Sequence, residues 1–338
     1  MKKQFSLPLY PDIDPAYLND DIIPFLIENS DSIFDLYFTC RIPPFDQDAM
    51  GTIFGEDDWM TPIANALYVQ QQTGIPISAT FNNKFISPNA QNMRLWIENF
   101  KPLYDAGIKS VTLPFTSWLM FGEIQKTFPK LYIKNTVLWA LDEPRQVYDA
   151  FINGFDYVNL DRNLIRNQEK LKIIDEARNA AQQKLGKKLR LSVLYNESCV
   201  GNCPIQEEHY LYNVNNNPQT QPVIFFKSEM NKIACYQWEK EDKSYGFKKS
   251  NIVYDKDFLD GLSMIDVFKL HGRENRKVFE NSLAIISHFD TNTPLHDELQ
   301  ILREKYNVPD DKWKEWLKTI RNCNFDCWKC KACDDLVE

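Results

Sequence analysis

The stretch IKNTVLWALDEPRQVYDAFINGFDYVNL, residues 133–160, holds the unit from which the fold is predicted. Ile133–Leu138 and Asp156–Leu160 are short runs containing β-branched and aromatic residues, which favour strands. Glu143–Phe151 lies between them and has helical spacing, with Pro144 in its first turn and Asp142 as its predicted cap. A strand, a helix and a second strand in so short a stretch are typical of a parallel βαβ unit.

The same alternation continues in both directions along the chain. The other predicted strands are Phe34–Thr39, Ile75–Phe81, Ile108–Leu113, Leu189–Tyr195, Asn251–Tyr254 and Ile265–Leu270. The other predicted helices are Thr61–Thr73, Ala90–Ala106, Leu164–Leu185, Arg276–His288, Pro294–Lys305 and Asp310–Arg321, and Leu211–Pro222 is predicted to be a loop or insertion. This pattern predicts a (β/α)8 TIM-like barrel over residues 1–275, a fold of about 250 residues, and a helical extension over 276–338 that ends in a four-cysteine tail. A doubly wound open sheet is the alternative.

Composition and charge narrow the class of protein. The chain has 338 residues, 43% of them hydrophobic, and a net charge of −8, which argues against tight nonspecific binding of nucleic-acid phosphates. The basic group Lys184, Lys187, Lys188 and Arg190 is interpreted as a solvated helix end. No apolar run of about eighteen residues and no secretory signal are found, so we expect a cytoplasmic protein without a membrane span. Clustered cysteines in that compartment indicate metal ligands before disulfides.

Four of the eight cysteines are packed into the tail: Cys323, Cys327, Cys330 and Cys333. Gaps of two and three residues let neighbouring thiolates converge on one centre. The spacing favours a 4Fe–4S cluster, with zinc as the alternative. The Cys-x3-Cys-x2-Cys spacing also occurs in radical SAM enzymes, but here it lies at the C-terminus with Lys329 in the usual aromatic position. We keep radical SAM chemistry as an alternative function.

A second group of cysteines follows the predicted strand Leu189–Tyr195. Cys199 and Cys203 lie in the loop after it, and Pro204 suits the start of a helix carrying His209. In a barrel this loop is at the C-terminal mouth, where active sites are built. Cys235 and Cys40 are the further candidate ligands, Cys40 because it ends the first predicted strand. An inert buried thiol is the competing interpretation for each lone cysteine.

The motif Leu-Tyr-Asn196-Glu197-Ser-Cys199-x3-Cys203-Pro204, with His209 and Cys235 after it, resembles the collagenase-like peptidase family U32. The segments Ser250-Asn251-Ile252 and Ile265–Arg273 resemble it too, and the order of elements agrees over roughly residues 30–275. The resemblance implies a TIM barrel with a 4Fe–4S cluster on four cysteines. It also implies oxygen-independent hydroxylation of quinone precursors or RNA bases. The cysteine gap is shorter here than in the family, and the cysteine tail lies outside the family's common core.

Polar residues at predicted strand ends complete the candidate site. They are Asn82 and Asn83 after the second predicted strand, Arg162 after the fifth, Glu197 and His209 near the mouth cysteines, and Lys269, His271 and Arg273 after the eighth. Glu197, His209 and Arg273 are the catalytic candidates, and the others are expected to bind substrate or an anion. Turns, caps, a surface histidine and a salt-bridged turn are the competing structural interpretations.

The leading expectation is an iron–sulfur oxidoreductase of hydroxylase type with one or two 4Fe–4S clusters. Its expected partners are a small-molecule or RNA-base substrate, an electron donor and a related partner subunit. A metal-dependent peptidase is a further alternative, although the sequence holds no His-Glu-x-x-His motif and only four histidines. A non-enzymatic electron carrier with structural clusters is the last.

Overall fold

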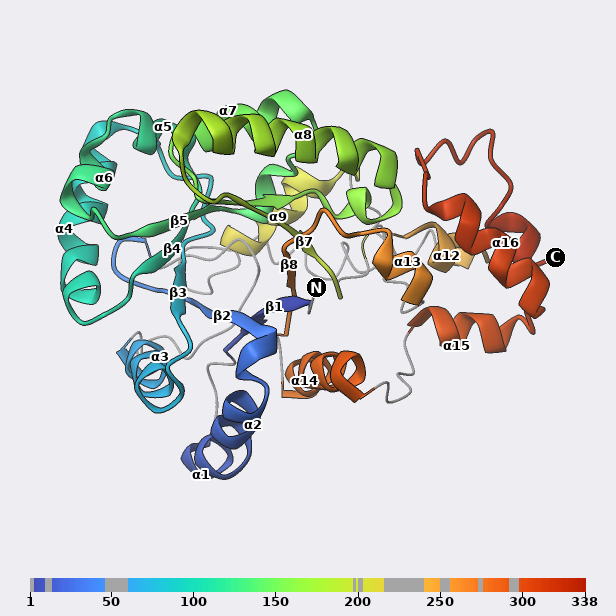
Figure 1. The fold of residues 1–338 in the computed structure, drawn as a ribbon, viewed down its shortest axis with the longest axis horizontal. Coiled ribbons are helices and arrows are strands. Elements are labelled where there is room, and N and C mark those ends of the chain that lie inside the picture. The colour runs from blue at the N-terminus through green and yellow to red at the C-terminus, as the bar shows by residue number, and fades with distance from the viewer. Residues whose placement is uncertain are drawn as a thin grey trace.

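The computed structural model describes residues 3–9, 14–45, 60–196, 199, 203–215, 240–249, 256–272, 276–291 and 298–338. Its centre is a closed barrel of eight parallel strands in chain order (Figure 1). The strands are β1 (Gln4–Pro8), β2 (Ile33–Thr39), β3 (Ile77–Thr80), β4 (Ser110–Leu113), β5 (Tyr132–Asn135), β6 (Tyr157–Leu160), β7 (Arg190–Leu194) and β8 (Val267–Lys269). The barrel closes where β1 pairs with β8, with Gln4 opposite Val267.

This closure confirms the predicted (β/α)8 barrel and shows that the open-sheet alternative is wrong. Seven of the predicted strands correspond to β2–β8, with ends that differ by at most three residues. The first strand of the barrel, β1, was not predicted. The predicted strand Asn251–Tyr254 lies outside the described residues. Cys40 therefore follows the second strand of the barrel, Asn82 and Asn83 the third, and Arg162 the sixth.

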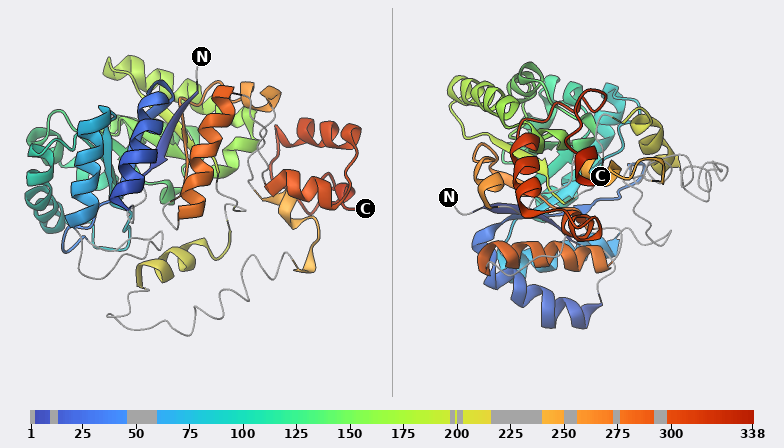
Figure 2. Two further views of the ribbon diagram at one scale, coloured as in Figure 1. Left: turned by 90° about the horizontal axis from the view of Figure 1, so that it is seen from below. Right: turned by 90° about the vertical axis from the view of Figure 1, so that its right-hand side faces the viewer.

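Helices cover the outside of the barrel, as both views of Figure 2 show. The α-helices are α1 (Pro15–Tyr17), α2 (Ile23–Glu28), α3 (Met60–Thr73), α4 (Ala90–Asp105), α5 (Thr116–Met120), α6 (Glu123–Thr127), α7 (Pro144–Ile152), α8 (Gln168–Leu185), α9 (Gln206–Asn215), α12 (Tyr245–Lys248), α13 (Lys256–Asp260), α14 (Arg276–Thr291), α15 (Glu298–Lys305) and α16 (Asp310–Ile320). A π-helix, η1 (Leu18–Ile22), and the 3-10 helices η2 (Ser30–Ser32), η3 (Val137–Trp139), η4 (Arg162–Arg166) and η5 (Asp334–Leu336) complete the described elements. None of the described helices is both long and apolar enough to span a membrane.

Two helices begin in a different way from the prediction. The cap of α7 is Glu143, whose backbone N–H donates to Gln146 Oε1 at 3.3 Å, whereas Asp142 contacts Lys170 at 3.3 Å. The predicted helix Leu164–Leu185 is two helices, η4 and α8. Asn167 interrupts it with a non-helical ψ of 77°, and its side chain caps α8 by accepting from the Lys170 N–H at 2.9 Å.

A third difference concerns the predicted loop Leu211–Pro222. Its first residues, Leu211–Asn215, belong to α9, and the rest lies outside the described residues.

The core lies between the strands and the helices around them. A cluster of aromatic rings fills the space under α4, where Trp96 stacks on Phe100 with ring centroids 4.7 Å apart. Inside the barrel the packing is partly polar, because Lys134 of β5 forms an ion pair with Asp35 of β2 and both side chains are 3% exposed. Ser6 of β1 donates a hydrogen bond to the same Asp35 carboxylate at 2.6 Å. A buried ion pair needs such additional partners, because both charges have lost their hydration.

The C-terminal helices α15 and α16 and the tail lie at one side of the barrel, next to α12 and α13 (Figures 1 and 2). Backbone hydrogen bonds attach the tail to the end of η4 and the start of α8. Cys323 N donates to Arg166 O at 2.7 Å, and Gln168 N donates to Arg321 O at 2.8 Å. Because η4 directly follows β6, the tail is attached at the carboxyl end of that strand, which is the mouth side of the barrel. The expected boundary between barrel and extension at residue 275 stays a prediction.

Candidate metal centre and barrel mouth

The carboxyl end of β3 brings two predicted residues to the mouth. Asn82 is 4% exposed, and its Oδ1 accepts a hydrogen bond from Thr136 Oγ1 at 3.0 Å, which joins the ends of β3 and β5. Asn83 Oδ1 accepts a hydrogen bond from Phe85 N at 3.0 Å. This side chain therefore forms a turn, which is the competing structural interpretation given above for it.

Helix α9 is fastened to the mouth by two residues that the sequence reading did not single out, Lys84 and Tyr210. Lys84 Nζ donates to Leu138 O at 3.0 Å and contacts Glu207 Oε1 of α9 at 2.6 Å. Tyr210 is buried, and its hydroxyl accepts hydrogen bonds from Arg162 Nη2 at 3.1 Å and Gln206 Nε2 at 2.9 Å. These contacts place α9 over the ends of β3, β5 and β6. Arg162, a predicted substrate residue, is therefore part of this attachment.

The end of β8 is joined to the end of β7 through Asn196. Its side chain donates to His271 O at 3.0 Å and accepts from His271 N at 2.6 Å. Lys269 is 7% exposed, with its ammonium 4.4 Å from the ring centroid of Tyr37. The predicted residues Lys269 and His271 therefore both lie at the mouth, Lys269 as the last residue of β8 and His271 just after it.

The mouth cysteines are in unlike surroundings. Cys40 is 2% exposed and packed in the hydrophobic core, and this burial raises the pKa of its thiol far above its usual value. Cys199 and Cys203 are half-buried, and His209 is exposed on α9 with its ring 6.3 Å from that of Tyr210. Glu197, Cys235 and Arg273 lie outside the described residues, so a shared mouth centre stays a prediction.

The tail thiols receive hydrogen bonds of the kind found around metal thiolates. Phe325 N donates to Cys323 Sγ at 3.3 Å, and the positive φ of Phe325, 57°, turns the backbone toward that sulfur. Trp316 Nε1 of α16 donates to Cys333 Sγ at 3.4 Å. Such N–H···S bonds stabilise a sulfur that carries negative charge. Cys327 is half-buried and Cys330 is exposed.

The guanidinium of Arg166 faces these thiols from the barrel side. Arg166 is 1% exposed, and its Nη1 donates to Phe247 O at 2.6 Å. Its Nε and Nη2 have no hydrogen-bond partner among the described residues. Burial lowers the pKa of Arg166, whereas negative charge on the neighbouring Cys333, Cys323 and Cys327 would raise it. Sequence reasoning missed Arg166, because nothing in its local sequence separates it from a solvated arginine on a helix.

The protonation of the tail also bears on metal binding. Burial raises the pKa of Cys333 to about 11, and burial likewise raises the pKa of Cys327. Both are therefore thiols at neutral pH, and a metal would have to displace their protons. The described residues contain no group of three or more His, Cys, Asp or Glu side chains arranged so that they could hold a metal ion. The donor chemistry nevertheless fits a thiolate-bound centre, because two of the sulfurs accept N–H···S bonds and a buried cation with two partnerless nitrogens lies near three of them.

Comparison with known proteins identifies the fold. No model of a known protein family matches the sequence, and no curated protein matches it. Among solved structures, the U32 peptidase Mk0906 is similar with a TM-score of 0.50 and 12% identity, over 82% of this chain and 96% of that one. A mutant O-GlcNAc hydrolase of Thermobaculum terrenum is similar over 92% of this chain and 65% of that one, with a TM-score of 0.49 and 8% identity. The chain is a (β/α)8 barrel that shares the fold of a U32 peptidase.

Proposed function

We propose that this chain is an iron–sulfur TIM-barrel enzyme that modifies a small molecule or a nucleic-acid base by redox chemistry, with oxygen-independent hydroxylation as the leading reaction. In this proposal Cys323, Cys327, Cys330 and Cys333 hold a centre at the side of the barrel mouth. The observation that carries it is the buried guanidinium of Arg166, which faces these thiols with two partnerless nitrogens.

The energetic reason is the cost of burying a charge. An arginine stays protonated in proteins, and a buried cation without a counter-charge costs several kcal/mol, of the order of the effective penalty per buried ion. Neutral thiols do not repay this cost, whereas a centre bound by four thiolates carries net negative charge and would do so. The thiolates would also make the existing N–H···S bonds from Phe325 and Trp316 stronger, because hydrogen bonds to charged acceptors are stronger than those to neutral ones.

The position of the tail supports a role in reactions at the mouth. Arg162 and Arg166 begin and end η4, and a 3-10 helix rises about 2.0 Å per residue, so their backbones lie roughly 8 Å apart along its axis. When bound, an iron–sulfur cluster supplies one-electron transfer. The chain's own residues provide the rest of the site. Arg162 and Lys269 are buried cations at the mouth, which would orient an oxygen-rich or anionic substrate, while the pair of Lys84 with Glu207 holds α9 next to them.

The proposal is tested by the metal and sulfide content of anaerobically purified protein, combined with EPR or Mössbauer spectra. A tail cluster alone predicts about four irons and four sulfides per chain, and a second cluster at the mouth predicts about eight of each. Cys330→Ala should remove the tail signal, and Cys199→Ala should remove only a mouth signal. Lys329→Ala, which alters the same tail without removing a thiol, should retain both. One zinc per chain and no sulfide would overturn the iron–sulfur proposal.

A further inference from the structure

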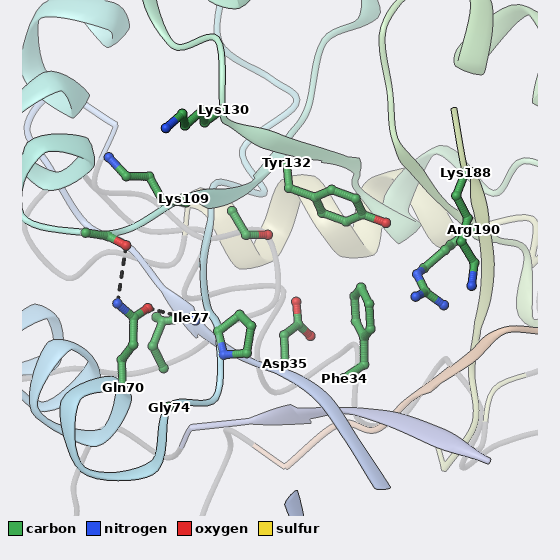
Figure 3. Close-up of a pocket in the computed structure, with 13 residues that line it drawn as sticks. Phe34, Asp35, Gln70, Gly74, Ile77, Lys109, Lys130, Tyr132, Lys188 and Arg190 are labelled. Carbon is green, nitrogen blue, oxygen red and sulfur yellow. Dashed lines mark hydrogen bonds between the residues drawn. The ribbon is translucent and has the colours of Figure 1, made fainter. Parts of the chain in front are cut away.

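A cavity of 640 Å³ lies at the end of the barrel opposite the mouth (Figure 3). Its walls are built from residues at the start of the strands, among them Asp35 of β2, Ile77 of β3, Ser110 of β4 and Tyr132 of β5. This amino-terminal end is the face of a TIM barrel that usually serves stability. The volume nevertheless falls within the range of about 300–1,000 Å³ typical of small-molecule sites.

The lining of this cavity is electropositive. Four cations contribute to it: Lys109, Lys130, Lys188 and Arg190. Within the part of the chain that the structure describes, Lys130, Lys188 and Arg190 form no ion pair. Asp35 is the one carboxylate among the lining residues, and it is already engaged by Lys134 and Ser6.

The acidic groups next to the rim are engaged in ion pairs of their own, although Asp266 shares Arg178 with Asp175. Asp156 is paired with Lys187 at 2.6 Å, and Asp266 is paired with Arg178 at 2.8 Å. Lys109 donates to Tyr104 O, so the positive charges available to a ligand are those of Lys130, Lys188 and Arg190.

The middle of the cavity is aromatic. The Phe34 ring stacks on Tyr157 with centroids 5.7 Å apart and an interplanar angle of 19°, and the Tyr132 ring lies 6.0 Å from it. The Arg190 guanidinium lies 4.7 Å from the Phe34 centroid. Figure 3 shows Phe34 and Tyr132 between two sets of cations, with Lys109 and Lys130 on one side and Lys188 and Arg190 on the other.

We infer that this cavity binds a small planar aromatic anion. An aromatic ring fits against Phe34 and Tyr132, because offset or tilted ring pairs are favourable beyond their buried area. The acidic group of the ligand would meet Arg190, whose planar fork matches a carboxylate or a phosphate, or the lysines opposite it. The site is at the far end of the barrel from the tail thiols and the mouth, so it stands independently of the proposed redox function.

Isothermal titration calorimetry with two pairs of probes tests the inference. Adenosine monophosphate is compared with adenosine, and benzene-1,4-dicarboxylate with cyclohexane-1,4-dicarboxylate. At least one planar anion should bind, at least about tenfold more tightly than its neutral or non-planar counterpart, and more weakly as salt rises. The probe that binds identifies the acidic group as phosphate or carboxylate.

Variants locate the binding. Lys130 and Lys188 are exposed, so the double variant Lys130→Glu/Lys188→Glu should fold normally and bind at least about tenfold more weakly. Lys172→Glu makes the same kind of charge change on the exposed face of α8, away from the cavity, and should bind like the parent protein. Phe34→Leu should weaken the binding of the aromatic anions and leave the salt dependence of that binding unchanged. Equal binding by the double variant and the parent, or no binding by either planar anion, would overturn the inference.

Discussion

Replacing Arg166 with methionine separates a metal-linked role of this residue from a purely structural one. Methionine keeps much of the side-chain volume and removes the charge. In the metal-free protein the change loses the hydrogen bond to Phe247 O, which as a charge-assisted bond is worth about 1.5–3 kcal/mol. It also removes a buried cation whose Nε and Nη2 have no partner among the described residues. These two effects oppose each other, so the free energy of unfolding should change by only about 1–2 kcal/mol.

The metal-loaded protein should respond differently. There the cation faces a negatively charged centre, and two unit charges about 5 Å apart interact by roughly 3 kcal/mol at an effective dielectric constant of about 20. Arg166→Met should therefore lower metal affinity roughly a hundredfold, because about 1.4 kcal/mol corresponds to a factor of ten. Arg166→Lys keeps the charge and should recover part of this affinity.

The assay measures urea unfolding of the metal-free and metal-loaded forms together with metal affinity by competition with a chelator. Arg178→Met is the matched control, because Arg178 is a half-buried arginine that pairs with Asp175 and Asp266 and faces no thiol. It should lower stability equally in both forms and leave metal affinity unchanged. If Arg166→Met also changes the free energy of unfolding of both forms equally and leaves metal affinity unchanged, Arg166 has no interaction with a bound metal and the electrostatic reasoning fails.

Three further predictions concern the barrel itself. Asp35→Asn leaves the buried Lys134 without its counter-charge and should cost roughly 3–5 kcal/mol of unfolding free energy in urea, whereas Asp35→Leu/Lys134→Met should cost much less; equal losses would contradict the buried pair. Burial raises the pKa of Tyr157 well above 10.0, so its contribution to stability is complete below pH 10 and is lost at higher pH. The free energy of unfolding in urea, measured between pH 8 and 11, should therefore decrease less steeply with pH for Tyr157→Phe than for the parent protein. Tyr210→Phe removes the acceptor for Arg162 and should speed amide hydrogen exchange in α9 by roughly tenfold, while exchange in α4 stays unchanged. Unchanged exchange in α9 would show that this contact does not hold the helix.

The sequence predicted most of the barrel because its strands are short, buried and separated by helices. Strands buried on both faces appear as apolar runs, and β2 and β7 were found in this way. β1 was missed because its residues, Gln4–Pro8, contain only two large apolar side chains and end in proline. What makes it a strand is its pairing with β2 and β8, and the pairing with β8 joins residues more than 260 positions apart. Such a partner cannot be seen in a local window of sequence.

The same distinction between local and distant contacts decides which residues of the candidate sites could be predicted. The tail thiols were found because all four lie within eleven residues of sequence, so their proximity is local. Arg166 and Tyr210 were missed because each contacts groups from other elements. Lys188 and Arg190 were interpreted as part of a solvated helix end, but Arg190 begins β7 and both line the cavity at the amino end of the barrel. The sequence alone does not indicate whether a charged side chain faces water or a cavity.

The interruption of the predicted helix Leu164–Leu185 has a consequence for the site. In an α-helix, residues four apart lie on the same face, because each residue turns about 100°. In the 3-10 helix η4, with three residues per turn, Arg162 and Arg166 point about 120° apart. One can then reach Tyr210 over the mouth while the other reaches Phe247 and the tail thiols. A continuous α-helix would present both arginines to one neighbour. The 3-10 turn, ended by Asn167, is therefore what lets a single short element contact both the mouth and the proposed metal centre.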